Sequence, residues 1–314
     1  MRRPIAIALY ILTDMGRISE WASGRFSRGK VLFTGKRRHL TSMEVRGVQI
    51  AEELDGVCTR CRYLARPSVA SAPALFWIIE PDLELVEKFN GLTPQFFDPI
   101  NPRIDETGEF NRYCRAFKYL LLNTKSSINW LGPPPEEGWQ SWVIPHHHCN
   151  HDGYVLPEER LALPRNVGYL GQPEHLHDRE AIEAAVRKMG LEFVAFDTWD
   201  LNAYKKIDIG IAWTRRDELR DQTRSNIKLT NFAAHGIPSV VCDYESYRDV
   251  NRTVGEVGVV AGDLGSFVEC LSEVVKHESV RRSMQSKATA AKDAYSISRI
   301  AQQYSDAIKA AQKG

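Results

Sequence analysis

The sequence predicts an α/β fold made of two doubly wound, Rossmann-like domains that face a cleft. Three observations predict it. Short apolar runs alternate with amphipathic runs, which is the order of strands and helices in a parallel sheet. This alternation is broken between residues 131 and 165, where Pro, Gly and His are dense, and then begins again. A length of 314 residues with 43% hydrophobic content suits two full cores, which we expect over 1–150 and 151–314.

The elements of the first half follow from apolar runs and helical spacing. A strand is expected at 31–34, and a helix at 43–54 has its apolar side at helical spacing, with Ser42 as N-cap. The continuous apolar run 74–79 is typical of a strand buried on both faces. An aromatic-rich helix is predicted over 110–122. The remaining predictions are strands at 57–64, at PQFFD ending on Asp98 and at 142–144, and a helix at 81–90.

The second half repeats the pattern. Strands are expected at 166–171, 191–196, 208–213 and 239–242, with a well-patterned helix over 178–190. The tail over 264–313 is predicted to form three short helices. Two such halves leave a crevice at the carboxyl ends of their strands, where a ligand is expected.

The clearest unit is RSNIKLTNFAAHGIPSVVCDYESYRD, residues 224–249. Ser225 or Asn226 is expected to cap a helix that runs to His235, and Gly236 supplies the left-handed residue after it. Pro238 prevents the helix from continuing. One face of this helix is apolar and is predicted to be buried, whereas a second face forms a polar stripe; the stripe consists of Lys228, Asn231 and His235.

Positive charge at the start of this helix indicates a bound anion. Lys228 and Arg224 oppose the helix dipole, which favours an anion that reverses the balance. Gly171, at the end of the strand at 166–171, allows backbone amides to approach a phosphate. Arg215 directly follows the strand at 208–213, and its guanidinium can donate two hydrogen bonds to a phosphate. The alternatives are a lysine that reaches solvent and, for Arg215, a solvated charged loop.

The motif SNIKLTNFAAHGIPSVV, with the preceding strand DIGIAW, resembles the donor-binding segment of GT-B glycosyltransferases, over roughly residues 166–260. In that family the polar helix start lies over the diphosphate of the nucleotide sugar. The resemblance implies donor binding by Ser225, Asn226 and Lys228, the last matching the phosphate-binding lysine. It also implies that 1–150 takes the acceptor, that 151–314 takes the donor, and that a C-terminal helix crosses back to the first domain.

Asn231 stands where many retaining members have the second Glu of a Glu-x7-Glu pair, and Thr223 stands at the first. The resemblance implies a donor contact for Asn231, and the missing acids leave the stereochemical outcome open.

An inverting transfer needs a base, usually from the first domain. Asp98 ends a strand at the cleft edge, and Glu44 and His39 lie at the first loop–helix junction. Arg46 is a candidate for binding an acidic acceptor. Asp98 as a turn residue and Glu44 as a first-turn carboxylate are the alternatives.

The motif IPHHHCNHD between the halves allows two interpretations. Its place at the end of a strand resembles the position where GT-B members line the cleft, which implies that His146 and His147 contact the donor. The same His and Cys residues, with Cys58 and Cys61, are also ligand types suited to zinc, and they would then mark a zinc-binding regulatory protein.

The sequence therefore predicts a metal-independent glycosyltransferase with a nucleotide-sugar donor and a glycan or small-molecule acceptor, for which a cell-surface glycan precursor is expected. It predicts no cofactor, because no Asp-x-Asp of the metal-dependent kind is present. A nucleotide-sugar epimerase or a polyol-phosphate transferase on the same fold is the alternative. A net charge of +1 disfavours nucleic acid, and six irregularly spaced cysteines favour the cytoplasm. The sequence predicts no membrane span, and peripheral membrane association stays open.

Overall fold

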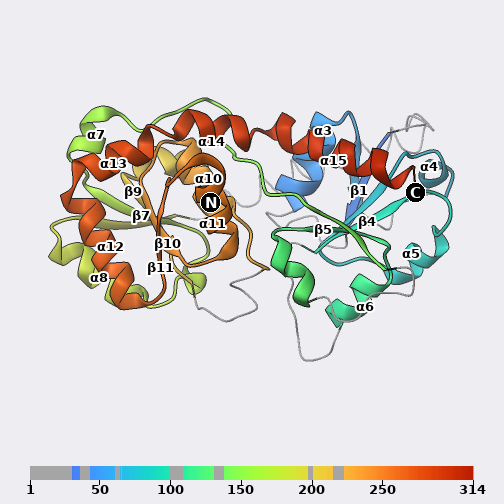
Figure 1. The fold of residues 1–314 in the computed structure, drawn as a ribbon, viewed down its shortest axis with the longest axis horizontal. Helices are drawn as coiled ribbons and strands as arrows, with labels where there is room; N and C mark the ends of the chain where they lie inside the picture. Colours follow the sequence, from blue (N-terminus) through green and yellow to red (C-terminus); the bar gives the residue numbers. More distant parts are fainter. Residues whose placement is uncertain are drawn as a thin grey trace, which may run out of the picture.

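The computed structural model describes residues 30–35, 43–60, 64, 66–99, 109–130, 138–196, 201–214 and 223–313. The predictions for His39, Ser42, Cys61 and Arg215 lie outside these residues. Figure 1 shows two α/β domains side by side, each built on its own sheet.

The first domain contains a six-stranded sheet in which every pair of neighbours is parallel, in the order β2-β1-β3-β4-β5-β6. Its strands are mostly buried on both faces, as the continuous apolar runs predict. The strands are β1 (Leu32–Gly35), β2 (Val57–Arg60), β3 (Leu75–Ile78), β4 (Gln95–Asp98), β5 (Tyr119–Leu122) and β6 (Gln140–Val143). The helices are η1 (Glu44–Gln49), α3 (Ile50–Glu53), α4 (Arg66–Ala70), α5 (Leu83–Lys88), α6 (Glu109–Arg115) and η3 (Lys125–Trp130).

The predicted helix over 110–122 is wrong in its second half. α6 ends at Arg115, and Tyr119–Leu122 is strand β5 between β4 and β6. All four residues of this strand are buried. A short apolar run that is buried on every side carries no helical or strand period, so spacing does not distinguish the two.

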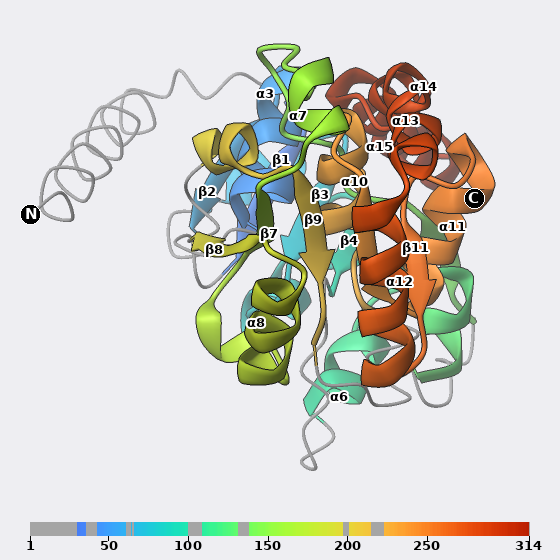
Figure 2. The same ribbon diagram turned by 90° about the vertical axis from the view of Figure 1, so that its left-hand side faces the viewer.

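The second domain contains a five-stranded parallel sheet in the order β11-β10-β9-β7-β8. α8 and α12 cover its face turned away from the first domain, and α10 and α11 cover the opposite face (Figures 1 and 2). The strands are β7 (Asn166–Leu170), β8 (Glu192–Phe196), β9 (Ile209–Ala212), β10 (Ser239–Cys242) and β11 (Val259–Ala261). The helices are α7 (Glu158–Ala162), η4 (Pro173–His175), α8 (Arg179–Lys188), η5 (Leu201–Lys206), α10 (Ile227–Ala234) and α11 (Glu245–Val254).

Helix α10 begins and ends where the sequence predicts, with Gly236 at φ +66° after its last turn. Its predicted polar stripe is largely buried, which corrects the expectation of a polar face: Asn231 is 2% exposed and His235 is 3% exposed. The reason is the linker, residues 144–156, which lies on this face. The Cys149 amide donates to Asn231 Oδ1 at 2.7 Å, and the Leu156 amide donates to the His235 carbonyl at 2.9 Å.

The tail forms four helices where three were predicted, and the last one returns to the first domain as the GT-B resemblance implies (Figure 1). Tyr304 Oη donates to Asp98 Oδ2 at 3.0 Å, and Tyr119 Oη donates to the Ala311 carbonyl at 3.2 Å. Helix α15 therefore follows the second sheet in sequence but lies against the first. The four helices are α12 (Leu264–Lys276), α13 (Glu278–Gln285), α14 (Ala288–Ala294) and α15 (Ile297–Ala311).

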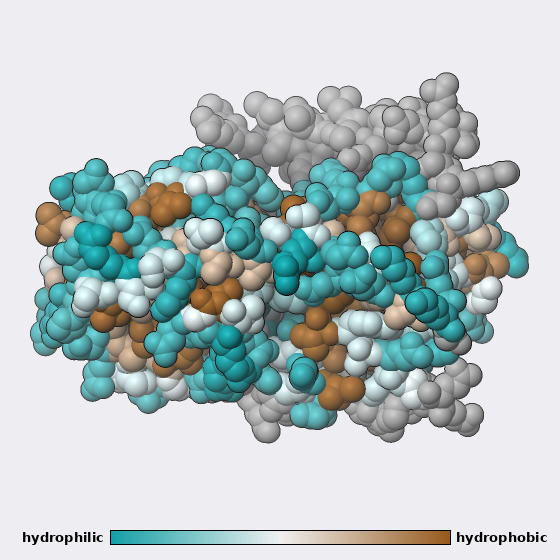
Figure 3. Space-filling model, turned by 45° about the horizontal axis from the view of Figure 1, so that its top comes forward, coloured by the Kyte–Doolittle hydropathy of each residue, from teal (hydrophilic) through white to brown (hydrophobic). Residues whose placement is uncertain are grey.

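The molecular surface is mostly hydrophilic on the face seen in Figure 3, with apolar side chains in small separate groups. In the described part of the chain, the large apolar side chains with the greatest exposure are Ile128, Val143, Val155 and Leu163. Among the described helices, none has the length and the apolar character that crossing a bilayer requires.

Candidate functional site

The carboxyl ends of β7 and β10 meet the start of α10, and two cations lie there. Lys228 Nζ is 3.8 Å from the centroid of the ring of Tyr169, the last residue but one of strand β7. Gly171 follows that strand. A Cβ on Gly171 would lie 2.7 Å from Lys228 Nζ and 2.7 Å from Tyr169 Oη, so only glycine lets the ammonium group come this close to the backbone. We call Gly171, Arg224 and Lys228 the cationic cradle.

The electrostatics of the cradle favour an anion. Burial, followed by the positive charge of Arg224, lowers the pKa of Lys228 to about 7. Arg224 Nε is buried with no hydrogen-bond partner among the described residues. Within the same part of the chain, neither side chain forms an ion pair with a carboxylate. Both side chains are half-buried and carry like charge, so a bound anion would relieve the repulsion between them.

The start of α10 adds its dipole to the cradle. Asn226 holds the N-cap position, but its side chain does not cap the helix. Instead Asn226 Oδ1 accepts from the His146 amide at 2.8 Å, and Asn226 Nδ2 donates to Thr230 Oγ1 at 2.6 Å. The positive end of the helix dipole therefore lies beside Lys228, where an anion is favoured.

The wall of the cradle is built from residues that the sequence analysis missed. The Tyr244 and Thr214 hydroxyls are hydrogen-bonded to each other, and the Thr214 amide donates to Cys242 Sγ at 3.2 Å. Burial raises the pKa of Tyr244 to about 12, so this wall is neutral at physiological pH. Thr214 and Tyr244 each follow a strand of the second sheet, and that position is the signal that could have identified them.

Four predicted donor contacts lie in the joint between the domains, where their polar groups hold the linker. They are Asn226, Asn231, His146 and His147. The two ring nitrogens of His147 lie 3.0 Å from the Val45 carbonyl and 2.9 Å from the His148 carbonyl. Burial lowers the pKa of His147, and that of His146 falls well below its usual value, so both rings are neutral. Their geometry favours a structural role, in which they hold the linker between the domains. None of the hydrogen bonds described for them involves the cradle.

Asp98 and Arg46 form a buried ion pair in the first domain. Arg46 Nε donates to Asp98 Oδ2 at 2.8 Å, Arg46 Nη2 lies 2.7 Å from the same oxygen in the ion pair, and the two side chains are 0% and 1% exposed. Arg46 Nη1 also donates to the Ile144 carbonyl at 2.6 Å. A base must reach the acceptor hydroxyl, whereas Asp98 is enclosed by Arg46 and Tyr304. This geometry favours a structural role for both residues over the predicted catalytic and acceptor-binding roles.

Two other predicted residues lie near the linker and the cradle. Glu44 begins η1 and is half-buried; its charge adds to the burial that raises the pKa of the Cys149 thiol to about 11. Glu44 is therefore close to the linker. Ser225 is 6% exposed and directly precedes Asn226, the N-cap residue of α10. His39 and Arg215, which were predicted beside them, are outside the described residues.

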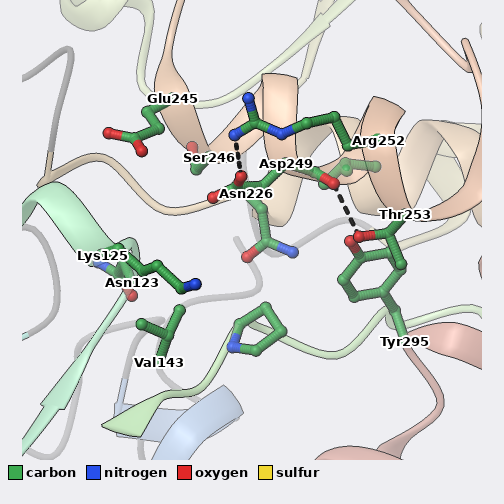
Figure 4. Close-up of a pocket in the computed structure, with 12 residues that line it drawn as sticks. Asn123, Lys125, Val143, Asn226, Glu245, Ser246, Asp249, Arg252, Thr253 and Tyr295 are labelled. Atoms are coloured by element: carbon green, nitrogen blue, oxygen red, sulfur yellow. Dashed lines mark hydrogen bonds and ion pairs between the residues drawn. The ribbon is translucent and has the colours of Figure 1, made fainter. Parts of the chain in front are cut away.

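A pocket of about 490 Å³ lies between the domains, at the side of the cleft covered by α11 (Figure 4). It combines residues after β5, residues around the linker, the start of α10 and one face of α11. Figure 4 shows the Lys125 ammonium and the Asn226 amide directed into it. The charged and amide side chains that line it are those of Asn123, Lys125, Asn226, Glu245, Asp249 and Arg252.

The predicted zinc ligands are placed differently from a metal site. The described part of the chain contains no group of three or more His, Cys, Asp or Glu residues that could hold a metal ion. His148 Nε2 lies 3.1 Å from the Lys292 carbonyl, and its Nδ1 accepts from the Asn150 amide. With His147, this ring fastens the linker to its surroundings.

No family model matches this sequence, and no curated protein matches it. Solved structures do match. Sucrose-phosphate synthase from Thermosynechococcus elongatus has a TM-score of 0.60 at 9% identity, over 90% of this chain and 99% of that chain. Anabaena HepE, solved with UDP-glucose, has a TM-score of 0.56 at 9% identity, with the same two coverages. The lipopolysaccharide outer core galactosyltransferase WaaB has a TM-score of 0.57 at 13% identity, again over 90% and 99%. The chain has the GT-B fold, as the resemblance implied.

Proposed function

We propose that this protein is a glycosyltransferase that moves a sugar from a nucleotide-activated donor to a hydroxyl acceptor without a metal ion. The observation that carries the proposal is the cationic cradle: Lys228 and Arg224 lie together at the start of α10, beside Gly171. A departing nucleoside diphosphate gains negative charge as the bond to the sugar breaks. Positive groups held in place beforehand stabilise that charge.

The cradle lies where ligands bind in doubly wound sheets, at the carboxyl ends of the strands. Lys228 and Arg224 bring positive charge to this point, and the dipole of α10 adds to it. This is the charge that a divalent cation supplies in other transferases, which supports a metal-independent reaction. HepE, one of the structural neighbours, was solved with UDP-glucose, and this supports a nucleotide-sugar donor.

We also propose the cytoplasm as the place of action and a precursor of a cell-surface glycan as the acceptor. Cys114, Cys149 and Cys270 are free thiols in the structure. Free thiols persist in reducing compartments, which supports this location.

Calorimetric titration with UDP, GDP, ADP, CMP and CDP, with and without EDTA, tests the proposal. We expect one nucleotide to bind selectively and EDTA to leave its affinity unchanged. Binding by none of the five would refute the function, and loss of binding in EDTA would refute metal independence.

A second assay separates the transferase from an epimerase on the same fold. The preferred nucleotide sugar is incubated with the protein without an added acceptor and is followed by NMR. A transferase releases at most a slow hydrolysis product, whereas an epimerase produces a second nucleotide sugar.

A further inference from the structure

We propose that the pocket of Figure 4 binds the acceptor, a polyol of about monosaccharide size, and that Glu245 accepts the proton of the reacting hydroxyl. This inference rests on the proposed function and assigns the acceptor side of the same reaction. Arg46 and Asp98, the residues that the sequence predicts for that side, are buried against each other.

The pocket and the cradle meet at the segment 223–228. Lys228, on one side of this segment, faces Tyr169 and Gly171. Asn226, on the other side, lines the pocket. Asn123, which also lines the pocket, donates to the Thr223 carbonyl at 2.9 Å, directly before Arg224. A sugar whose diphosphate lies in the cradle would therefore have the pocket beside its reacting carbon.

The chemistry of the pocket suits a neutral ligand rich in hydroxyl groups. Lys125 and Arg252 are balanced by Glu245 and Asp249, and Arg252 is already ion-paired with Asp249. Two lining residues, Asn123 and Ser246, have buried side-chain oxygens with no hydrogen-bond partner among the described residues. Hydroxyl donors from a ligand would satisfy them. The volume of about 490 Å³ falls in the range of about 300–1,000 Å³ that small-molecule sites occupy.

Glu245 is the carboxylate that the geometry singles out. It lies in the first turn of α11, three residues after the end of β10, and points toward the first domain (Figure 4). The Ser126 hydroxyl donates to Glu245 Oε2 across the cleft. An alcohol bound to a carboxylate oxygen is the arrangement that a general base needs with its substrate. An acceptor hydroxyl that displaced Ser126 would meet the same oxygen.

The transfer is a displacement at the anomeric carbon. The acceptor oxygen forms a bond to the anomeric carbon while its proton moves to Glu245. The bond from that carbon to the phosphate oxygen breaks, and its electron pair leaves with the nucleoside diphosphate, whose charge Lys228 and Arg224 stabilise.

The test measures release of nucleoside diphosphate from the donor, with water alone and with D-glucose or glycerol added. Water is itself a hydroxyl acceptor, so slow hydrolysis gives a readout before the natural acceptor is known. Glu245→Gln should slow release by about 10²- to 10⁴-fold, the usual contribution of a general base, with unchanged nucleotide affinity. Ser126→Ala should keep the wild-type rate, because Ser126 only occupies the place of the acceptor. Glu278→Gln, another first-turn glutamate, is the matched control.

Each failure has its own signature. If Glu245→Gln keeps the wild-type rate, Glu245 is not the base. If Ser126→Ala slows release of the nucleoside diphosphate as much as Glu245→Gln does, the hydrogen bond between the two residues has a structural role in holding the domains together. That result would overturn the assignment of Glu245 as the base. If the protein binds a nucleotide but neither releases nucleoside diphosphate from the donor nor binds D-glucose or glycerol, the pocket is not the acceptor site. If the wild-type protein binds no nucleotide at all, the proposed function itself fails.

Discussion

Lys228 holds its ammonium nitrogen 3.8 Å from the centroid of the Tyr169 ring, in a space that exists because residue 171 is glycine. The ring face attracts the cation, while burial and Arg224 disfavour its charge and lower its pKa to about 7. Near pH 7 the lysine therefore exists in both its protonated and its neutral form. It lies at the positive end of the helix dipole, which favours an anion.

Replacement of Lys228 by alanine should remove one charge-assisted contact to the diphosphate. We expect a loss of about 1.5–3 kcal/mol, roughly a 10- to 150-fold rise in Kd, in calorimetric titration. Lys188→Ala, at an exposed position in the last turn of α8, is the control and should bind normally. Unchanged affinity in Lys228→Ala would remove Lys228 from the phosphate site.

The affinity for the nucleotide should depend on pH through Lys228. A pKa of about 7 means that the free protein loses this proton as the pH rises through 7, and only the protonated form attracts a diphosphate. Affinity should therefore fall above pH 7, by up to about tenfold per pH unit. Lys228→Arg, which stays charged, should flatten the profile. Parallel profiles for the two proteins would show that another group titrates.

Gly171→Ala should weaken nucleotide binding without unfolding the domain. The added methyl group would lie 2.7 Å from both Lys228 Nζ and Tyr169 Oη, so the ends of these side chains have to shift away from residue 171. Gly265→Ala, in the first turn of α12, tests the general effect of a methyl group. Its nearest contact is Asp263 Oδ1 at 3.1 Å. Equal nucleotide affinity in the two variants would contradict the close approach of Lys228 to residue 171.

Asp98→Asn should destabilise the protein, because it leaves the Arg46 guanidinium buried without its carboxylate. Removing one partner of a buried pair costs about 3–5 kcal/mol, measurable by urea denaturation. Asp306→Asn, on the exposed surface of α15, is the control. A variant that keeps its stability but loses turnover would instead restore Asp98 as the base.

Acid should loosen the linker through His148. Burial, above all, lowers the pKa of His148 to about 4 in the folded protein, against about 6.5 in an unfolded chain. The unfolded chain then binds the proton first, so the stability from this group is complete above about pH 6.5 and is lost toward pH 4. His148→Gln should make this loss shallower in urea denaturation at a series of pH values. The exposed His277→Gln should not, and equal slopes for all three proteins would refute the role of His148.

Local signals were enough to predict the elements with clear ends. Helix α10 begins at polar residues and ends before Gly236, and Asp82 caps α5 by accepting from the Leu85 amide. Continuous apolar runs mark the buried strands. The same rules failed at Tyr119–Leu122, where an apolar run has no period. Helix α11 was not predicted, although a carboxylate soon after β10 is a signal that could have drawn attention to Glu245.

The sequence by itself determined two parallel sheets, their order along the chain and the cationic start of α10, because strands, caps and helix dipoles depend on neighbours a few residues away. Only the tertiary structure decided which polar residues face a ligand. Asn226, Asn231, His146 and His147 are buried because the linker lies on α10, and Asp98 is buried because α15 returns to the first domain. These contacts join residues 80 or more positions apart, and such distances in sequence carry no local pattern.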